Sequence, residues 1–222
     1  MGRRVCGVKF ADAHDTRLVP ALRRRRPGKP FVAVHCVDPA ETGAVLRAGT
    51  TAGARLSRLR VEHASFVPPD WLPAFAQLGA TVVTHPSFVT ANGDRYLTEA
   101  LLEPHDWLYR LASWGRAGVA VAFASDAPFG PASPLGALRA AASRRTAGGA
   151  SIGPDEALSG GDALRAVTAA AADCSGLSRL GYGRLAPGRP GCAVVLDHDP
   201  RDPAQLADAQ VIATVSGGAV AD

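Results

Sequence analysis

Five side chains that bind metal ions or move protons stand at the ends of short apolar runs. Lys9 lies in the first run, His35, His63 and His85 end the next three, and Asp126 follows the fifth. Imidazole and carboxylate groups are ligands that divalent ions such as zinc take in proteins. If the runs are parallel strands, their carboxyl ends form one rim, where active sites are built from several strands. The pattern therefore predicts a divalent-metal site, with zinc the preferred ion.

Each of these residues also has a structural interpretation. A single histidine at a strand end is more often a hydrogen-bonded structural residue than a ligand, but two of them with an aspartate at equivalent positions favour a metal site. Lys9 stands out because only it and Lys29 are lysines among the 24 basic residues. Lysine, unlike arginine, can lose its proton or be modified. His85 precedes a proline, so contact with metal or substrate and the shaping of a loop both remain open.

The other histidines and the cysteines lack such a setting. His14, His105 and His198 are interpreted as surface or loop residues. Cys36 follows His35 directly and, in a strand, points to the opposite face. The four cysteines form no C-x-x-C pair, which excludes a zinc ribbon, and their spacing argues against a disulfide framework. We therefore expect a reduced, cytoplasmic protein.

The elements that position these residues alternate between strand and helix. The strand-like runs lack polar alternation, as in parallel strands covered on both faces, and they span residues 5–10, 31–36, 59–62, 80–84 and 119–124. The helix-like stretches span residues 39–48, 69–78, 97–116, 135–145 and 161–172. This alternation predicts right-handed βαβ units in a parallel sheet or barrel over residues 1–180.

The character changes after Cys174, where glycine and proline become frequent. Two short strand-like runs follow at residues 192–196 and 211–215, and the second precedes Gly217 and Gly218. We expect residues 181–222 to form a small β element separate from the barrel part.

Composition sets limits on the class of protein. The chain has 222 residues, of which 47% are hydrophobic and 20% charged, as in an average soluble globular protein. No apolar run reaches the ~20 residues of a membrane span, and no signal peptide is recognisable. The net charge is +4, but the arginine-rich run at residues 23–26 has no interleaved aromatic residues. We interpret it as a solvated helix end, and we predict neither a nucleic-acid nor a membrane partner.

Several motifs together resemble the amidohydrolase superfamily, in particular the branch that includes N-substituted formamide deformylase. The order and spacing of three of them fit barrel strands five, six and eight, and they read FVAVH at 31–35, RVEHA at 60–64 and ASDAP at 124–128. The stretch 155–168 is similar to the helical segment after strand eight. The stretch 183–197 resembles the return into a small β-sandwich, where Gly191 and Cys192 replace the usual Ala-Asp.

The resemblance implies a fold and a set of roles. The fold is α/β, the C-terminal half of a metal-dependent-hydrolase-type (β/α)8 barrel, strands four to eight, with part of a small β-sandwich. His35 and His63 would bind a divalent metal, and Asp126 would bind it and act as general base. Lys9 matches the strand-four lysine that some branches turn into a bridging ligand. His85 is assigned to substrate binding, and the substrate would be a small molecule with an amide-type carbon–nitrogen bond.

The sequence departs from the family in one large respect. It contains no His-x-His motif, which in the family supplies two further ligands, and its first strand matches strand four. We expect a truncated amidohydrolase, with a truncated or degraded gene favoured over a split enzyme or an assembly of two copies. A non-catalytic remnant that keeps the fold and a different metal-dependent barrel hydrolase remain as alternatives.

Overall fold

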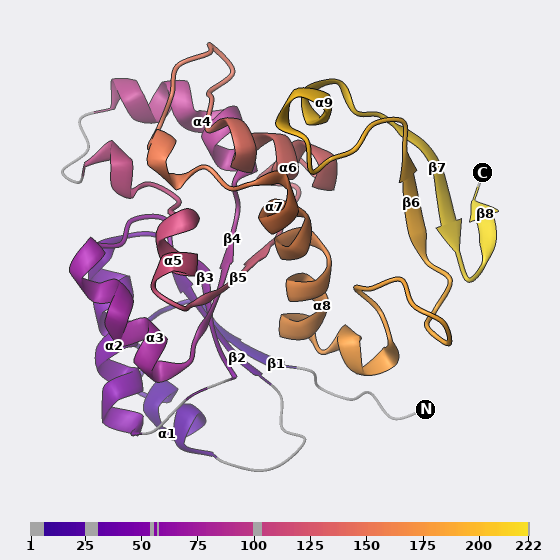
Figure 1. Cartoon of the computed structure of the whole chain (residues 1–222). Coiled ribbons are helices and arrows are strands. Elements are labelled where there is room, and N and C mark those ends of the chain that lie inside the picture. The colour runs from indigo at the N-terminus through magenta and orange to yellow at the C-terminus, as the bar shows by residue number, and fades with distance from the viewer. Residues whose placement is uncertain (1–6, 25–30, 54–55, 57, 100–103, 222) are drawn as a thin grey trace.

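A five-stranded parallel sheet forms the centre of the molecule. The computed structural model describes residues 7–24, 31–53, 56, 58–99 and 104–221. The strands lie side by side in chain order (Figure 1), as β1 (Gly7–Phe10), β2 (Phe31–Cys36), β3 (Leu59–His63), β4 (Thr81–Thr84) and β5 (Ala120–Phe123). All five predicted strand runs are present, although residues 5 and 6 lie outside the described part.

One face of the sheet is a row of β-branched side chains packed against helices. Val34, Val61 and Val82 are register partners on β2, β3 and β4, and all three are fully buried. They share a core with Phe75 and Trp114, whose rings meet edge to face at a centroid distance of 5.6 Å. The opposite face is mixed, because it carries the apolar Ala33 and Val83 beside the charged Arg60 and Glu62.

Helices and short 3-10 turns connect the strands. The helices are α1 (Leu18–Arg23), α2 (Pro39–Ala52), α3 (Leu72–Leu78), α4 (Ser87–Thr98), α5 (Ala112–Arg116), α6 (Pro134–Ser143), α7 (Gly160–Val167), α8 (Ala169–Ser175) and α9 (Pro203–Asp208). The 3-10 turns are η1 (Pro69–Trp71), η2 (His105–Trp107), η3 (Pro154–Glu156) and η4 (Leu177–Leu180). A capping box between Asp38 and Glu41 begins α2, and Gly79 in the left-handed conformation ends α3.

Two of the predicted helices are wrong in extent. The stretch 97–116 is not one helix, because α4 ends at Thr98, η2 and α5 follow, and residues 100–103 lie outside the described part. Glu99 is extended and Pro104 cannot donate a helical hydrogen bond, which explains the interruption. The stretch 161–172 is divided into α7 and α8 at Thr168, whose φ of −113° and ψ of −86° are not helical.

A second, antiparallel sheet follows the parallel one, as Figure 1 shows at its right. It consists of β6 (Ala193–Leu196), β7 (Val211–Ser216) and β8 (Ala219–Ala221) in that order. Gly217 and Gly218 join β7 to β8 with φ of 60° and 86°, the backbone of a type I′ hairpin turn that favours glycine. The predicted boundary between residues 180 and 181 stays a prediction.

Helix α9 attaches this region to the rest of the molecule. Leu206 is buried together with Ala137 and Leu138 of α6. The Arg139 guanidinium, also on α6, donates hydrogen bonds to the carbonyl oxygens of Leu206 and Ala209. In the described part of the chain, none of the helices is both long enough and apolar enough to cross a bilayer.

Candidate active site

Three imidazole rings lie in contact across the carboxyl ends of neighbouring strands. His35 is the penultimate residue of β2, His63 ends β3, and His85 follows β4. The ring centroids of His35 and His63 are 4.6 Å apart, and those of His63 and His85 are 4.5 Å apart. The parallel register therefore brings together side chains that are 28 and 22 residues apart in the sequence.

The backbone at this rim is unusual. His63, Ala64 and Asp126 have φ of 67°, 48° and 54°. Such left-handed conformations are uncommon for residues other than glycine and cluster at functional sites. They turn the chain sharply where β3 ends and just after β5.

The environment of the histidines keeps two of them neutral. Burial, together with the nearby rings of His85 and His35, lowers the pKa of His63 to about 4. Burial also lowers the pKa of His85, against the opposing effect of a hydrogen bond to the Ala124 carbonyl. A neutral imidazole keeps one lone pair for a metal ion or a proton.

The hydrogen bonds show where these lone pairs lie. His85 Nδ1 is 2.9 Å from the Ala124 carbonyl oxygen. Because a carbonyl only accepts, Nδ1 carries the proton and Nε2 of the neutral ring carries the lone pair. That Nε2 and the Nδ1 of His63 are buried and have no hydrogen-bond partner. Buried polar atoms are rarely left unpaired, so both nitrogens are suited to bind a metal ion or a polar group of a substrate.

Asp126 and Lys9 add opposite charges to this cluster. The Asp126 carboxylate raises the pKa of both His63 and His85, whereas the Lys9 ammonium lowers both. Both charges therefore act on the same two rings. Asp126 is half-buried after β5, and Lys9 is exposed on β1. All five residues singled out in the sequence therefore lie near one another at this rim. Their roles remain predictions.

The cluster has the donor chemistry of a metal site but not a complete set of ligands. Within the described ranges, no three His, Cys, Asp or Glu side chains are arranged to hold an ion. His35 and His63 meet edge to face with an interplanar angle of 74°. Neutral, unpartnered imidazole nitrogens beside a carboxylate fit part of a zinc site, which normally takes at least three protein ligands.

Several polar groups near the rim were not anticipated. Thr84 and Ser87 carry buried hydroxyl oxygens without hydrogen-bond partners, and the buried Ser65 hydroxyl lies beside the Tyr109 hydroxyl, whose pKa it lowers. Ser65 and Ser87 each follow a predicted site histidine by two residues, which is the signal that could have found them. Tyr109 also lies near the cluster, because the Asp126 charge contributes to its raised pKa, after burial and Tyr96. Its position between η2 and α5 gave no signal in the sequence.

The remaining histidines and Cys36 lie elsewhere. His14 and His198 are exposed, His105 is partly exposed in η2, and His198 Nδ1 is 2.8 Å from an Asp197 carboxylate oxygen. Cys36 is fully buried in the core on the helix-covered face of β2. Burial raises the pKa of its thiol, which is unsuited to nucleophilic chemistry.

Residues 13–222 match the model of the amidohydrolase family. The chain belongs to this amidohydrolase family. It is 34% identical over 163 residues to N-substituted formamide deformylase from Arthrobacter pascens, an alignment that covers 72% of this chain and 30% of that protein.

Solved structures show the same fold. An uncharacterized metal-dependent hydrolase from Pyrococcus horikoshii is 27% identical, with a TM-score of 0.69 over 88% of this chain and 42% of its own. Atrazine chlorohydrolase TrzN from Arthrobacter aurescens, complexed with zinc, is 22% identical, with a TM-score of 0.58 over 86% of this chain and 43% of its own. The chain thus spans less than half of each relative, and the amidohydrolase fold is confirmed as a partial α/β barrel with a small antiparallel sheet.

Proposed function

We propose that this amidohydrolase chain carries part of the active site of a metal-dependent hydrolase that cleaves carbon–nitrogen bonds in small amide-type substrates. The observation that carries the proposal is the contiguous imidazole cluster at the ends of β2, β3 and β4, with unpartnered nitrogens on His63 and His85. The name of the formamide deformylase relative supports the type of bond.

The proposed roles of the residues are metal binding, proton transfer and substrate binding. His35 and His63 would hold a divalent ion, with zinc the preferred metal, and Asp126 after β5 and Lys9 on β1 would contribute to the same site. A divalent ion in this place supplies Lewis acidity, which makes water more acidic and polarises a carbonyl. Further ligands would come from outside the described residues.

Asp126 would carry the proton transfers. Its carboxylate accepts a proton from the attacking water and delivers it to the leaving nitrogen of the amide. His85 is fixed by its bond to the Ala124 carbonyl, so its buried Nε2 carries the lone pair and has no hydrogen-bond partner. In that orientation it accepts a hydrogen bond from an N–H group of the substrate and thereby orients the bond to be cleaved.

The site requires completion by more polypeptide. An upstream extension, a separate chain or a second copy would supply the other ligands and close the sheet into a barrel. Placement of ligands within ~0.5 Å matters for such sites, so the 222-residue chain alone is expected to bind metal weakly and to turn over amides slowly or not at all. Within the described residues, Cys36, Cys174 and Cys192 are free thiols, which supports a reducing, cytoplasmic setting.

A non-catalytic remnant is the second candidate. The incomplete ligand set among the described residues favours it. A remnant and a catalytic part differ in whether the imidazole cluster still binds metal, and this difference can be measured directly.

The test combines metal binding with activity. Zinc and cobalt affinities are measured by equilibrium dialysis and elemental analysis on the purified chain, on His35→Ala and His63→Ala, and on the control His198→Ala. We expect weak binding that falls at least about tenfold in the two cluster variants and is unchanged in the control. Adding the missing barrel half should raise both metal content and the hydrolysis of N-substituted formamides. Equal affinities in all four proteins would refute the proposed site.

A further inference from the structure

The imidazole cluster continues into a row of aromatic rings that ends on helix α4. Consecutive centroids are 4.5–6.4 Å apart. In order, the row consists of His35, His63, His85, Phe88, Tyr109 and Tyr96. Tyr109 is the only member that is neither at a strand end nor on α4. Tyr109 is thus a loop residue within a row whose other members come from strand ends and from α4.

Tyr109 is held in a costly backbone conformation. Its φ is 46°, in the left-handed region, which costs an L-residue roughly 1–2 kcal/mol. Its amide donates to the Ser65 carbonyl at 2.8 Å, and its carbonyl accepts from Arg144 Nη1 at 3.0 Å. Such conformations persist only where the surroundings determine them from several sides.

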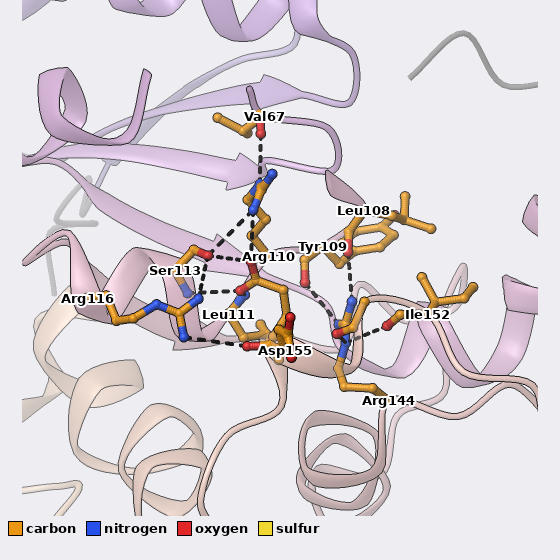
Figure 2. Close-up of polar contacts among 12 residues, drawn as sticks. Val67, Leu108, Tyr109, Arg110, Leu111, Ser113, Arg116, Arg144, Ile152 and Asp155 are labelled. Atoms are coloured by element: carbon orange, nitrogen blue, oxygen red, sulfur yellow. Dashed lines mark hydrogen bonds and ion pairs between the residues drawn. The ribbon is translucent and has the colours of Figure 1, made fainter. Parts of the chain in front are cut away.

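Arg144 is the anchor of this arrangement, as Figure 2 shows. Its side chain is fully buried, and its guanidinium donates to the carbonyl oxygens of Leu108, Tyr109 and Ile152 at 2.8–3.0 Å. Burial lowers the pKa of Arg144 to about 10, so it stays charged at neutral pH. The buried charge of Arg144 therefore holds the main chain around Tyr109 in place.

The anchored loop contacts the site in two ways. Through its ring, Tyr109 packs on Phe88 at a centroid distance of 5.8 Å, and Phe88 packs on His85 at 5.5 Å. Through its amide, Tyr109 holds Ser65, which lies two residues after His63 and just beyond the left-handed turn at Ala64. The first contact leads to the His85 ring, and the second fixes the segment that directly follows His63.

We propose that Tyr109 is a positioning residue that orients the imidazole rings of His85 and His63. The inference deepens the proposed function, because it assigns the support of the same cluster, but it concerns ring orientation and does not require turnover. The positive φ of Tyr109 and the buried Arg144 that holds its carbonyl together fix the place of its ring in the row.

Imidazole NMR spectra of the purified 222-residue chain test the proposal. Long-range ¹H–¹⁵N spectra report the tautomer and environment of each ring at a fixed pH. Tyr109→Leu removes the ring but keeps the amide hydrogen bond to Ser65. We expect the His85 signals to shift or broaden, and the His63 signals to follow through its ring contact with His85, while His14 and His198 keep their signals. Tyr109→Phe keeps the ring and should leave both signals as they are in the unmodified chain.

Tyr182→Leu is the matched control, because it removes a tyrosine ring that is not in the row. It should leave all histidine signals in place. If Tyr109→Leu does not fold, Phe88→Leu tests the same link from α4 and should change the His85 signals. Unchanged His85 and His63 signals in a folded Tyr109→Leu, or the same change in Tyr182→Leu, would overturn the proposal. Failure of the unmodified chain to bind zinc would count against the proposed function only, since the imidazole signals remain readable.

Discussion

At the scale of single residues, Glu156 shows how a buried charge supports the loops around the site. Its carboxylate accepts hydrogen bonds from Arg110 Nη1, from the amides of Leu111 and Ser113, and from the Ser113 hydroxyl. Figure 2 shows Arg110, Leu111 and Ser113 converging on this point. The carboxylate therefore joins η3 to the loop that carries Tyr109, and its ionisation affects both.

Replacing Glu156 by glutamine should destabilise the protein in a pH-dependent way. Burial alone would raise the pKa of Glu156, but the bonds from Ser113 and Leu111 and the Arg110 charge together lower it below the ordinary 4.5. The stabilisation is thus complete above about pH 4.5 and is lost as the pH falls through the lower, folded-state pKa. We expect Glu156→Gln to lose about 3 kcal/mol at pH 7 in urea unfolding and to show a flatter acid limb.

The control is Glu99→Gln, which breaks the exposed ion pair with Arg95. It should cost less than about 1 kcal/mol and leave the acid limb unchanged. Equal losses in both variants would contradict the special role of the buried carboxylate.

The strand-end residues were visible in the sequence, because a histidine or aspartate directly after an apolar run is a local pattern. Tyr109 and Ser65 were not, because their importance depends on a hydrogen bond between segments 44 residues apart. The unpartnered nitrogen of His85 also depends on tertiary structure, since the Ala124 carbonyl determines the tautomer.

At the scale of elements, the strands were easier to predict than the helices. Runs such as residues 31–36 are continuous and apolar, and helices cover one face of them in the structure. Helix α4 was missed because its sequence, SFVTANGDRYLT, contains Thr, Asn and Gly, which have low helix propensity. Burial of Phe88 and Val89 against the core outweighs that propensity.

Adjacent glycines at the start of α7 test how closely the C-terminal region packs on the barrel part. A Cβ on Gly160 would lie 2.3 Å from the Pro200 carbonyl oxygen and 2.7 Å from Arg201 Cα, whereas one on Gly161 would meet nothing closer than 3.9 Å. We expect Gly160→Ala to lower the free energy of unfolding by roughly 1–3 kcal/mol through overpacking.

Gly161→Ala is the internal comparison, and it should be neutral or stabilising by up to about 1 kcal/mol, because alanine favours helix. Thermal unfolding followed by circular dichroism measures both. Equal stability of the two variants would show that the segment at Pro200 does not pack on α7 as described.

At the scale of the whole molecule, the antiparallel sheet exposes apolar side chains. Val194 on β6 and Ile212 on β7 are 56% and 62% exposed and share one face of this sheet, because Val194 pairs with Thr214. Val220 on β8 is 68% exposed on the other face, where it pairs with Val215. Contiguous exposed apolar residues mark surfaces that other polypeptide covers or that associate. This agrees with the proposal that more polypeptide completes the structure.

Replacing Ile212 by lysine should therefore reduce self-association of the isolated chain. We expect a smaller weight-average mass in sedimentation experiments at high protein concentration and weaker binding of a hydrophobic dye. Leu185→Lys, at an equally exposed residue outside the sheet, should change neither quantity as much. A chain that remains monomeric at all concentrations would contradict the expectation.

The order of strands in the parallel sheet has a consequence for how the chain folds during synthesis. Each of β2 to β5 pairs with the strand that immediately precedes it in the chain. Each new strand can therefore pair with a strand that has already left the ribosome. None of these four pairings requires a segment that is synthesised later. Domains fold from the N-terminus as they are synthesised, so this sheet can grow by one strand at a time. Each step closes only the loop between consecutive strands, which keeps the entropy cost of loop closure low.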